Sequence, residues 1–400
     1  SRAHTAVKIA PNYSGPVVYV PDASRSVTVT QSLLSPEQGP AFLAELRADY
    51  EKIRVQHRDK KGPGPLHPIA EARTLGLKTD WSAYAPPRPV KPGLTVLQNY
   101  PLAELVPYID WTPFFQAWEL SGAYPKILED PVVGDAARKL FAEANAMLDR
   151  IVREKWITAN GVVGLFPAAA VGDDIEIYRD EARRERLMSW HNLRQQNHKP
   201  AGRPNLCLAD FVAPRESGIL DWIGAFAVTA GGGIDERVAA FEAAHDDYSA
   251  IMLKALADRL AEAFAEHLHE RVRREFWGYA TDEKLDNARL IAEEYRGIRP
   301  APGYPACPDH LGKRDLFTLL DAGPNAGMRL TESLAMLPAA SVSGFMLSHP
   351  ESSYFAVGKI GPDQVADYAA RAGMSLEDAE RWLAPSLGYE PRPAARAASL

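Results

Sequence analysis

The sequence predicts an α+β fold, mainly an antiparallel sheet with long helices. Three observations lead to this prediction. Strand-like runs between residues 158 and 360 do not alternate regularly with helices, as they would in a doubly wound α/β fold. Apolar residues recur at helical spacing over 235–276. Two strand-like runs flank "HPES" within 341–360, which is typical of a β-hairpin.

Composition narrows the class of protein. The 400 residues carry a net charge of -7, and this acidic balance argues against nucleic-acid binding. Apolar runs stay well short of the ~18 residues that span a bilayer, and the opening "SRAHTAVKIAP" lacks the features of a signal peptide. Because it opens on Ser1 rather than Met, we expect a piece of a longer or processed protein. The two cysteines, Cys207 and Cys307, predict reduced thiols in a cytoplasmic protein without a structural zinc site.

The first segments differ in character from the rest. "GPVVYVPDASRSVTVTQSLLS" at 15–35 predicts a buried strand, a turn and a short helix, the end of an α/β unit. "SPEQ" at 35–38 is typical of a helix start, and apolar residues follow at helical spacing as far as Ile53. Pro/Gly-rich stretches at 57–68 and 84–93 predict extended segments, with the domain boundary at the first or between the two.

Several strands are expected after residue 95. "ITANGVVGLFP" predicts a turn at Asn160-Gly161 before a short apolar strand. "GDDIEIYRD" at 172–180 alternates as a half-exposed strand does, and 205–213 and 221–230 are typical of buried strands. The glycines at 229–235 match neither a dinucleotide fingerprint nor a P-loop, so we interpret them as a flexible connection.

The longest helix is expected over 235–276. Asp258 and Glu262 share a face one turn apart. His267 and His269 are two residues apart and therefore do not face one another, so a solvated face is favoured over a metal site. The apolar stripe expected in the core comprises Phe241, Tyr248, Met252, Leu256, Leu260, Phe264, Leu268 and Val272.

The stretch "RPAPGYPACPDH" at 299–310 is unusual. Each proline fixes φ and pushes the preceding residue toward extended geometry, so a stiff, extended loop is expected. Gly303 permits a turn or the close approach of a ligand. Arg299 can bind a carboxylate with two hydrogen bonds, and the carbonyl groups can accept from an amino group. A ligand cradle and a merely structural loop both remain open.

A second cluster is the aromatic stretch at 108–130, which contains Asp110. The carboxylate either caps a helix that begins at Thr112-Pro113 or binds a ligand ammonium group. Motifs for a catalytic nucleophile are not found.

Together these motifs resemble a known family. "YIDWTPFF", "YPKILEDPVVG", "GIRPAPGYPACPDH" and "LTESLAMLPAASVSGFMLSHPESSYFAV" are similar to the C-terminal activation domain of cobalamin-dependent methionine synthase. The resemblance implies that residues 1–35 are the end of a cobalamin-binding domain and 36–61 a helix and linker. It further implies an S-adenosylmethionine-binding activation domain at 62–390 and a disordered tail at 391–400.

The resemblance implies a methyltransferase function. In the full enzyme, a methyl group passes from methyltetrahydrofolate to homocysteine through cobalamin. The activation domain binds S-adenosylmethionine and presents its methyl to reduced cobalamin, with an electron from flavodoxin or an equivalent reductase. The DxHxxG cobalt-ligand motif, the folate barrel and the zinc site of the homocysteine domain are absent from this sequence. The implied partners are therefore the reductase and a cobalamin-binding domain, in the same enzyme or in a separate subunit.

The resemblance also assigns residues. Asp110 is implied to bind the ligand amino group, and Arg299 of an RxxxGY motif its carboxylate, with Tyr304 on the cobalt-facing side as the tentative catalytic residue. Glu262 and Glu293 are implied as supporting carboxylates, and Asp258 as facing the cobalamin domain. The remaining implied S-adenosylmethionine contacts are Ala301, Gly303, Tyr304 and the hairpin pair Tyr354 and Phe355.

Two other functions remain as alternatives. A free-standing methyltransferase is disfavoured because the common nucleotide-binding glycine motif is not found. A non-catalytic docking domain for an acidic reductase would use the basic run at 183–203, which includes Arg183, Arg184 and Arg186. A solvated face is the favoured interpretation of the same run.

Overall fold

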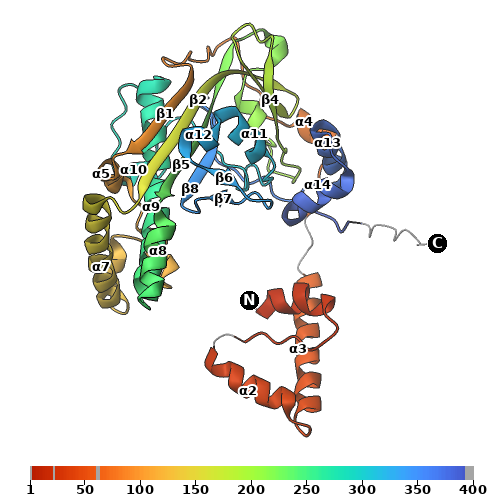
Figure 1. The fold of residues 1–400 in the computed structure, drawn as a ribbon. Helices are drawn as coiled ribbons and strands as arrows, with labels where there is room; N and C mark the ends of the chain where they lie inside the picture. Colours follow the sequence, from red (N-terminus) through yellow and green to blue (C-terminus); the bar gives the residue numbers. More distant parts are fainter. Residues whose placement is uncertain (1, 21–22, 60–63, 392–400) are drawn as a thin grey trace, which may run out of the picture. The chain divides into compact units, whose positions relative to one another are not determined.

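The computed structural model describes residues 2–20, 23–59 and 64–391 (Figure 1). The chain divides into two compact units, Ser1–Leu66 and His67–Leu400, and each is described by itself. The domain boundary expected at residue 62 lies outside the described residues. Of the tail expected at 391–400, only residue 391 is described.

The first unit is helical. Residues 15–20 were predicted as a buried strand, and this prediction is wrong: they form no strand, and their side chains are exposed or half-buried. A strand needs a neighbouring strand to which its backbone N–H and C=O groups can hydrogen-bond, and the described residues of this unit contain none. Its helical segments are α1 (Arg2–His4), η1 (Thr5–Ile9), η2 (Ala10–Asn12), α2 (Ala23–Leu34) and α3 (Gly39–Asp59).

The start of α3 follows from its sequence. The Ser35 hydroxyl accepts a hydrogen bond from the Gln38 N–H at 3.1 Å, as expected of a capping serine. Residues 36–38 form a turn, so the α-helix itself begins at Gly39. Tyr50 is buried and its hydroxyl accepts from the Tyr19 N–H at 2.9 Å, which fastens α3 to the preceding segment.

The second unit is built around one antiparallel sheet, which confirms the predicted fold class (Figure 1). The strand order is β4-β3-β2-β5-β8, and β1 pairs with the first half of β2, on the edge where β3 pairs with its second half. A separate pair, β6 with β7, lies outside this sheet. The strands are β1 (Gly93–Tyr100), β2 (Thr158–Val171), β3 (Asp174–Tyr178), β4 (Arg186–His191), β5 (Asp221–Gly232), β6 (Arg329–Leu330), β7 (Met336–Leu337) and β8 (Ser341–Met346).

Both faces of the sheet are covered. Phe226 and Val228 of β5 belong to a core with the long helices, whereas Ala225 and Ala227 belong to a second core on the opposite face. The helices of the first core include α7 (Gly134–Glu154), α8 (Ile234–Ala243) and α9 (Asp247–Arg271); those of the second include α11 (Gly312–Leu320) and α12 (Ala322–Ala326). The others are α4 (Ile69–Thr74), α5 (Leu102–Leu105), η3 (Val106–Tyr108), α6 (Thr112–Ala117), η4 (Lys126–Glu129), η5 (Leu208–Phe211), η6 (Arg215–Ser217), η7 (Val272–Phe276), α10 (Asn287–Ile291), α13 (Pro362–Ala372), α14 (Leu376–Trp382) and η8 (Ala384–Ser386).

The expected helix over 235–276 is interrupted. His245 has a positive φ of 56°, and the Asp246 carboxylate caps a new helix by accepting from the Ser249 N–H at 3.0 Å. Helices α8 and α9 are therefore separate, and α9 ends in the π-helical turn η7. Most of the predicted stripe is buried, but Phe241 is half-buried and Tyr248 is exposed.

Two strand predictions are wrong in detail. The turn at Asn160-Gly161 is absent, because both residues lie within β2; Gly161 is needed there since a Cβ would meet Val228 and Phe264 at 2.9 and 3.1 Å. The half-exposed strand at 172–180 is instead buried at every position of β3. Its acidic residue Glu176 tolerates burial because Arg186 and Arg215 each pair with it at 2.8 Å.

Two further segments are not the strands expected. Residues 205–213 are buried but contain the short helix η5, because the Asp210 carboxylate accepts from the Cys207 N–H and closes a turn. The run at 341–360 is no hairpin. Its first half is β8, but in its second half the Val357 N–H donates to the Pro305 carbonyl at 2.8 Å. Strand β5 is buried at every position except its last residue, as predicted for residues 221–230.

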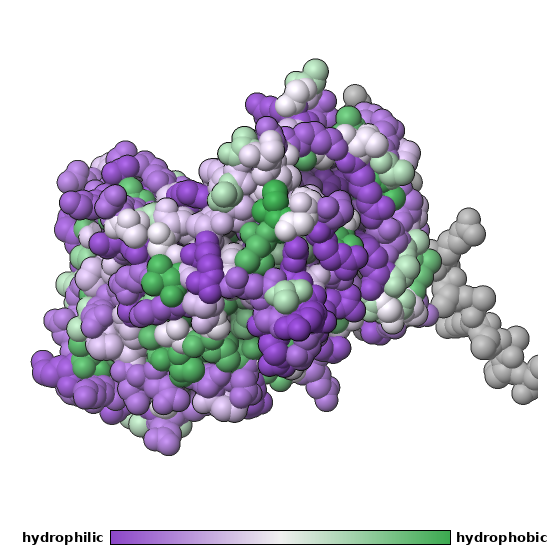
Figure 2. Space-filling view, turned by 90° about the horizontal axis from the view of Figure 1, so that it is seen from above, coloured by the Kyte–Doolittle hydropathy of each residue, from purple (hydrophilic) through white to green (hydrophobic). Residues whose placement is uncertain are grey.

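Hydrophobic side chains on the surface are scattered. Figure 2 shows a face dominated by hydrophilic residues, with hydrophobic ones gathered in a few small areas. Among the described helices, none combines the length and the apolar character that a membrane span requires.

Candidate ligand-binding cleft

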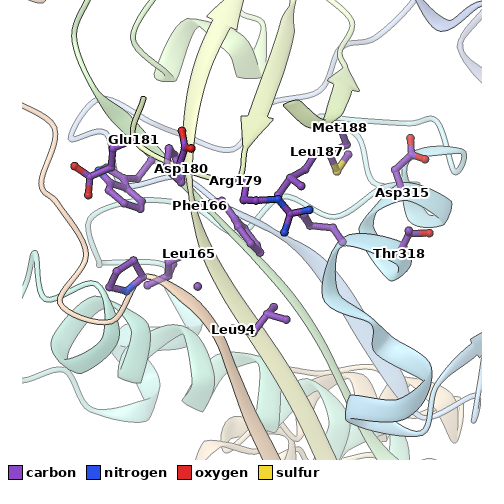
Figure 3. Close-up of a pocket in the computed structure, with 15 residues that line it drawn as sticks. Leu94, Leu165, Phe166, Arg179, Asp180, Glu181, Leu187, Met188, Asp315 and Thr318 are labelled. Carbon is purple, nitrogen blue, oxygen red and sulfur yellow. The ribbon is translucent and has the colours of Figure 1, made fainter. Parts of the chain in front are cut away.

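One large hollow of the second unit does not contain the predicted site residues. It has a volume of about 700 Å³ and lies where β1 and β3 meet along β2 (Figure 3). Arg179 extends into it from the end of β3, but its Nε donates to Glu185 at 2.7 Å. Glu181 at its rim is likewise paired with Arg88 at 2.8 Å. The charges of Arg179 and Glu181 in this hollow are thus neutralised by neighbouring residues.

Two smaller hollows contain the predicted residues. Their volumes are about 420 and 300 Å³, and Glu262, Glu293 and Arg299 line both. We call the two together the Arg299 cleft. The first half is mainly apolar and the second is rich in carboxylates. The predicted residues of the first half are Ala301, Tyr304, Tyr354 and Phe355, and that of the second half is Asp110.

The backbone of Arg299 is fixed by the sheet. Ile298 exchanges hydrogen bonds with Leu347 at 3.0 and 2.9 Å, and the Phe345 N–H donates to the Pro300 carbonyl at 2.9 Å. The segment therefore continues the sheet beside the end of β8. Gly344 makes this approach possible, since a Cβ there would lie 2.6 Å from the Pro300 carbonyl oxygen.

The loop after Pro300 is tight rather than extended. Residues 298–300 run beside the end of β8, but the Gly303 N–H then donates to the Cys307 carbonyl at 2.8 Å and folds the loop back. Gly303 has a φ of 99°, and a Cβ on it would overlap the ring of His310. The stiffness expected from the prolines stays a prediction, while the glycine decides the direction of the chain.

The guanidinium of Arg299 is held from behind by three residues. Its Nη2 donates to Glu266 Oε2 at 2.6 Å, and its Nη1 donates to the Tyr295 hydroxyl at 2.9 Å and lies 3.3 Å from His269 Nδ1. Burial opposes the charge, but the neighbouring Glu266 carboxylate and Tyr295 outweigh it and raise the pKa of Arg299. Arg299 therefore stays charged beside the cleft.

One carboxylate oxygen of Asp110 already accepts a hydrogen bond from the backbone. This oxygen, Oδ1, accepts from the Thr112 N–H at 2.9 Å, so Asp110 bonds the first N–H of α6, although the N-cap residue of this helix is Trp111. The side chain also lines the acidic half of the cleft. Both interpretations of Asp110 are therefore compatible with its position.

Two carboxylates stand where the halves of the cleft meet. Glu293 adopts a left-handed backbone conformation, with φ 57°, which is costly for a residue other than glycine and frequent at functional sites. Partial burial raises the pKa of Glu293, and Arg299 counteracts this effect. Glu262 is on α9, in the turn after Asp258. Asp258 is exposed and is not among the residues that line either half.

The aromatic residues form the rim of the apolar half. Tyr304 is 59% exposed, so its ring is accessible to a molecule at the cleft mouth. The Tyr354 hydroxyl accepts from the Arg299 N–H at 2.9 Å. Tyr354 and Phe355 were expected on a hairpin, but they lie on the segment that runs back toward Pro305. The contact with the cleft comes from this segment rather than from a strand.

Sequence reasoning missed three residues that hold Arg299. Glu266 and His269 were not singled out as site residues, and the solvated face expected around His269 is wrong because its ring is fully buried. His267 is half-buried and bonded to the Tyr100 hydroxyl at 2.8 Å. One signal was present: Glu262, Glu266 and His269 recur at helical spacing along the helix. The third missed residue is Tyr295.

The basic run at 183–203 is a solvated face only in part: residues 184–186 are exposed, but residues 192–196 are buried. Arg194 is buried between Asp173 and Asp210, at 2.7 and 2.6 Å. Of the arginines named for docking, Arg184 and Arg186 pair with acidic neighbours, and Arg183 donates to the Gly218 and Ile219 carbonyls. Across the described ranges, no group of three or more His, Cys, Asp or Glu residues is arranged to hold a metal ion. Cys207 and Cys307 are free and buried.

Comparisons with known proteins agree with the resemblance seen in the sequence. Residues 101–373 match the family described as vitamin B12-dependent methionine synthase, activation domain. A crystal structure described as the MetH reactivation domain bound to AdoHcy is 57% identical in sequence, with a TM-score of 0.79. That match covers 82% of this chain and 100% of the other. The chain therefore belongs to the activation-domain family of vitamin B12-dependent methionine synthase.

Proposed function

We propose that this chain binds S-adenosylmethionine in the Arg299 cleft and presents its methyl group to cobalamin during reductive reactivation of methionine synthase. The observation that carries the proposal is Arg299 itself, a charged and rigidly held guanidinium where an acidic and an apolar hollow join. The 57% identical reactivation domain bound to AdoHcy supports it.

The two halves of the cleft fit the two ends of the ligand. Asp110 suits the ammonium group, and Arg299 suits the carboxylate with its N–H donors. Ala301, Gly303 and Phe355 lie at or beside the apolar half, which suits the adenosine. Glu262 and Glu293 stand between the halves, where negative charge favours a sulfonium cation.

The chemistry required of the chain is positioning. Cobalamin, when bound by its own domain, supplies the nucleophile that takes the methyl from the sulfonium. A general base is not required, which agrees with the lack of a nucleophile motif in the sequence. Holding the donor in the attack geometry lowers the barrier by itself. We place Tyr304 on the cobalt-facing side because it is more exposed than Tyr354, the other tyrosine of the apolar half. We place Asp258 toward the cobalamin domain because it is exposed on α9.

The partners follow from this role. We propose a cobalamin-binding domain, in the same enzyme or as a separate subunit, and flavodoxin or an equivalent reductase as the electron donor, in the cytoplasm. The first 35 residues are proposed as the end of that domain, followed by a helix and linker.

The test is calorimetric titration with S-adenosylmethionine and S-adenosylhomocysteine. Arg299→Lys keeps the charge beside Glu266 but loses the planar fork, so affinity should fall by about tenfold or more. Arg289→Lys is the matched control, because Arg289 forms an ion pair with Glu294 at 2.7 Å and does not line the cleft. Equal affinities in wild type and Arg299→Lys would contradict the assignment of the site.

A further inference from the structure

The guanidinium of Arg299 has five N–H donors, and its neighbours use them unevenly. Glu266 takes one N–H of Nη2, while the Tyr295 hydroxyl and His269 Nδ1 face Nη1. Nε and the second N–H of Nη2 have no hydrogen-bond partner within the described parts of the chain. The three contacts from behind therefore leave two donors for a ligand in the cleft.

We propose that Tyr295 and His269 are positioning residues that aim these two donors of Arg299 at the carboxylate of the ligand. The inference rests on the proposed function, because it assumes a ligand with an amino-acid end. It deepens that function by naming residues that do not themselves line either half of the cleft.

His269 acts as a hydrogen-bond acceptor. Its ring is fully buried, and burial together with the nearby charges of Arg273 and Arg299 lowers the pKa of His269 well below its usual value. The imidazole is therefore neutral. Nδ1 can accept from Arg299 only if the ring proton is on Nε2. A doubly protonated, cationic ring at this position would repel the guanidinium.

Tyr295 is fixed on several sides. Its ring packs edge-on against His269, with 4.9 Å between ring centroids, and Arg273 lies 4.3 Å from its ring centre. Arg273 is itself anchored by Glu283 at 2.6 Å. The Tyr295 hydroxyl also lies 3.3 Å from that of Tyr354, which binds the backbone of Arg299. The hydroxyl that receives Nη1 thus has little freedom to move.

This arrangement reduces the conformational entropy that the arginine side chain loses when it binds a ligand. A long side chain with many rotamers loses conformational freedom when it binds a ligand, unless it is already ordered. Contacts to both Nη atoms order Arg299 in the absence of ligand. Removing the Tyr295 hydroxyl should restore part of that freedom without emptying the space that the ring fills.

The experiment compares two probes on the wild-type protein and on three variants, Tyr295→Phe, Tyr279→Phe and His269→Phe. S-adenosylhomocysteine has the amino-acid end, whereas 5′-methylthioadenosine lacks it. Tyr295→Phe should weaken binding of S-adenosylhomocysteine by about tenfold, the loss of one hydrogen bond to a charged group. Binding of 5′-methylthioadenosine should not change. Tyr279→Phe is the matched control: Tyr279 is a neighbouring tyrosine whose hydroxyl bonds the Arg296 carbonyl at 3.4 Å instead of Arg299.

The outcomes separate the possibilities. A loss confined to S-adenosylhomocysteine, repeated in His269→Phe, supports the inference. An equal loss for both probes would overturn it, because Tyr295 would then only shape the cleft. Unchanged binding of both would also overturn it while leaving the proposed function intact. A wild-type protein that binds neither probe would overturn the proposed function and this inference together. Thermal unfolding of each variant checks that it is folded.

Discussion

Arg299 and Glu266 form an ion pair of 2.6 Å in the wall of the cleft, between a loop fixed by the sheet and the long helix α9. The Glu266 side chain is 9% exposed and that of Arg299 is 21% exposed. Glu266 Oε1 is buried without a hydrogen-bond partner among the described residues. Arg299 therefore supplies most of the interaction that offsets the burial of the Glu266 charge.

Removing Arg299 should destabilise the fold as well as the site. Arg299→Met leaves the Glu266 carboxylate buried and unpaired, which should lower the free energy of unfolding by about 3–5 kcal/mol. Adding Glu266→Gln should recover part of this loss, because the second charge is also removed. Urea unfolding of the single and double variants measures both effects. A single variant as stable as wild type would show that water compensates Glu266.

Asp110 can be separated into its two roles. Asp110→Asn keeps an oxygen to accept from the Thr112 N–H but removes the charge. We expect affinity for S-adenosylhomocysteine to fall about tenfold, since a hydrogen bond to a charged group is lost, with little change in stability. Asp246→Asn, at the cap of α9, is the control and should leave affinity unchanged. If Asp110→Asn changes stability alone, the carboxylate is only a cap.

Gly303 is required by both its backbone angle and its surroundings. Gly303→Ala introduces a Cβ at φ 99° that overlaps His310, so the loop must shift. The strain is about 1–3 kcal/mol, and ligand affinity should fall with it. Gly172→Ala, at φ 62° with open space around it, should cost less stability and leave ligand affinity unchanged. Thermal unfolding and titration with S-adenosylhomocysteine measure the two quantities.

Asp221 should make stability depend on pH. Burial raises the pKa of its carboxyl from 3.8 to about 7, although the Ala213 and Trp222 N–H groups oppose the shift. The folded protein keeps this proton to a higher pH than the unfolded chain does. The free energy of unfolding therefore falls as pH rises from 3.8 to about 7, by up to about 1.4 kcal/mol per pH unit from this group.

The measurement is urea unfolding of wild type and Asp221→Asn across this interval. Other groups titrate as well, so the informative quantity is the difference between the two slopes. Asp221→Asn should remove the decrease that this carboxyl causes. Parallel pH profiles for the two proteins would mean that Asp221 is ionised in the folded state throughout.

Patterns that depend on neighbours in the sequence were predicted well. The Ser35 cap, the buried strand of β5 and the apolar stripe of α9 follow from residue types at short spacing. The stiffness of the loop after Arg299 stays a prediction, which rests on the restriction that each proline places on its own φ and on the residue before it. The cleft residues Asp110, Arg299 and Tyr304 were reached through the resemblance rather than through spacing alone.

Features that depend on distant segments were not predictable. Residues 352–358 have the composition of a strand, but the loop at 298–300 already occupies the edge beside β8. The polarity of Glu176 indicated exposure, but two arginines from other segments compensate its burial.

By itself, the sequence determined the α+β class and the family, and it singled out Asp110, Arg299 and Tyr304, which line the cleft. Only the tertiary structure decided that His269, from α9, and Tyr295 stand behind Arg299 and order its guanidinium. The physical reason is that burial and hydrogen-bond partners depend on which distant segments pack together, whereas local spacing fixes only the secondary structure of each segment.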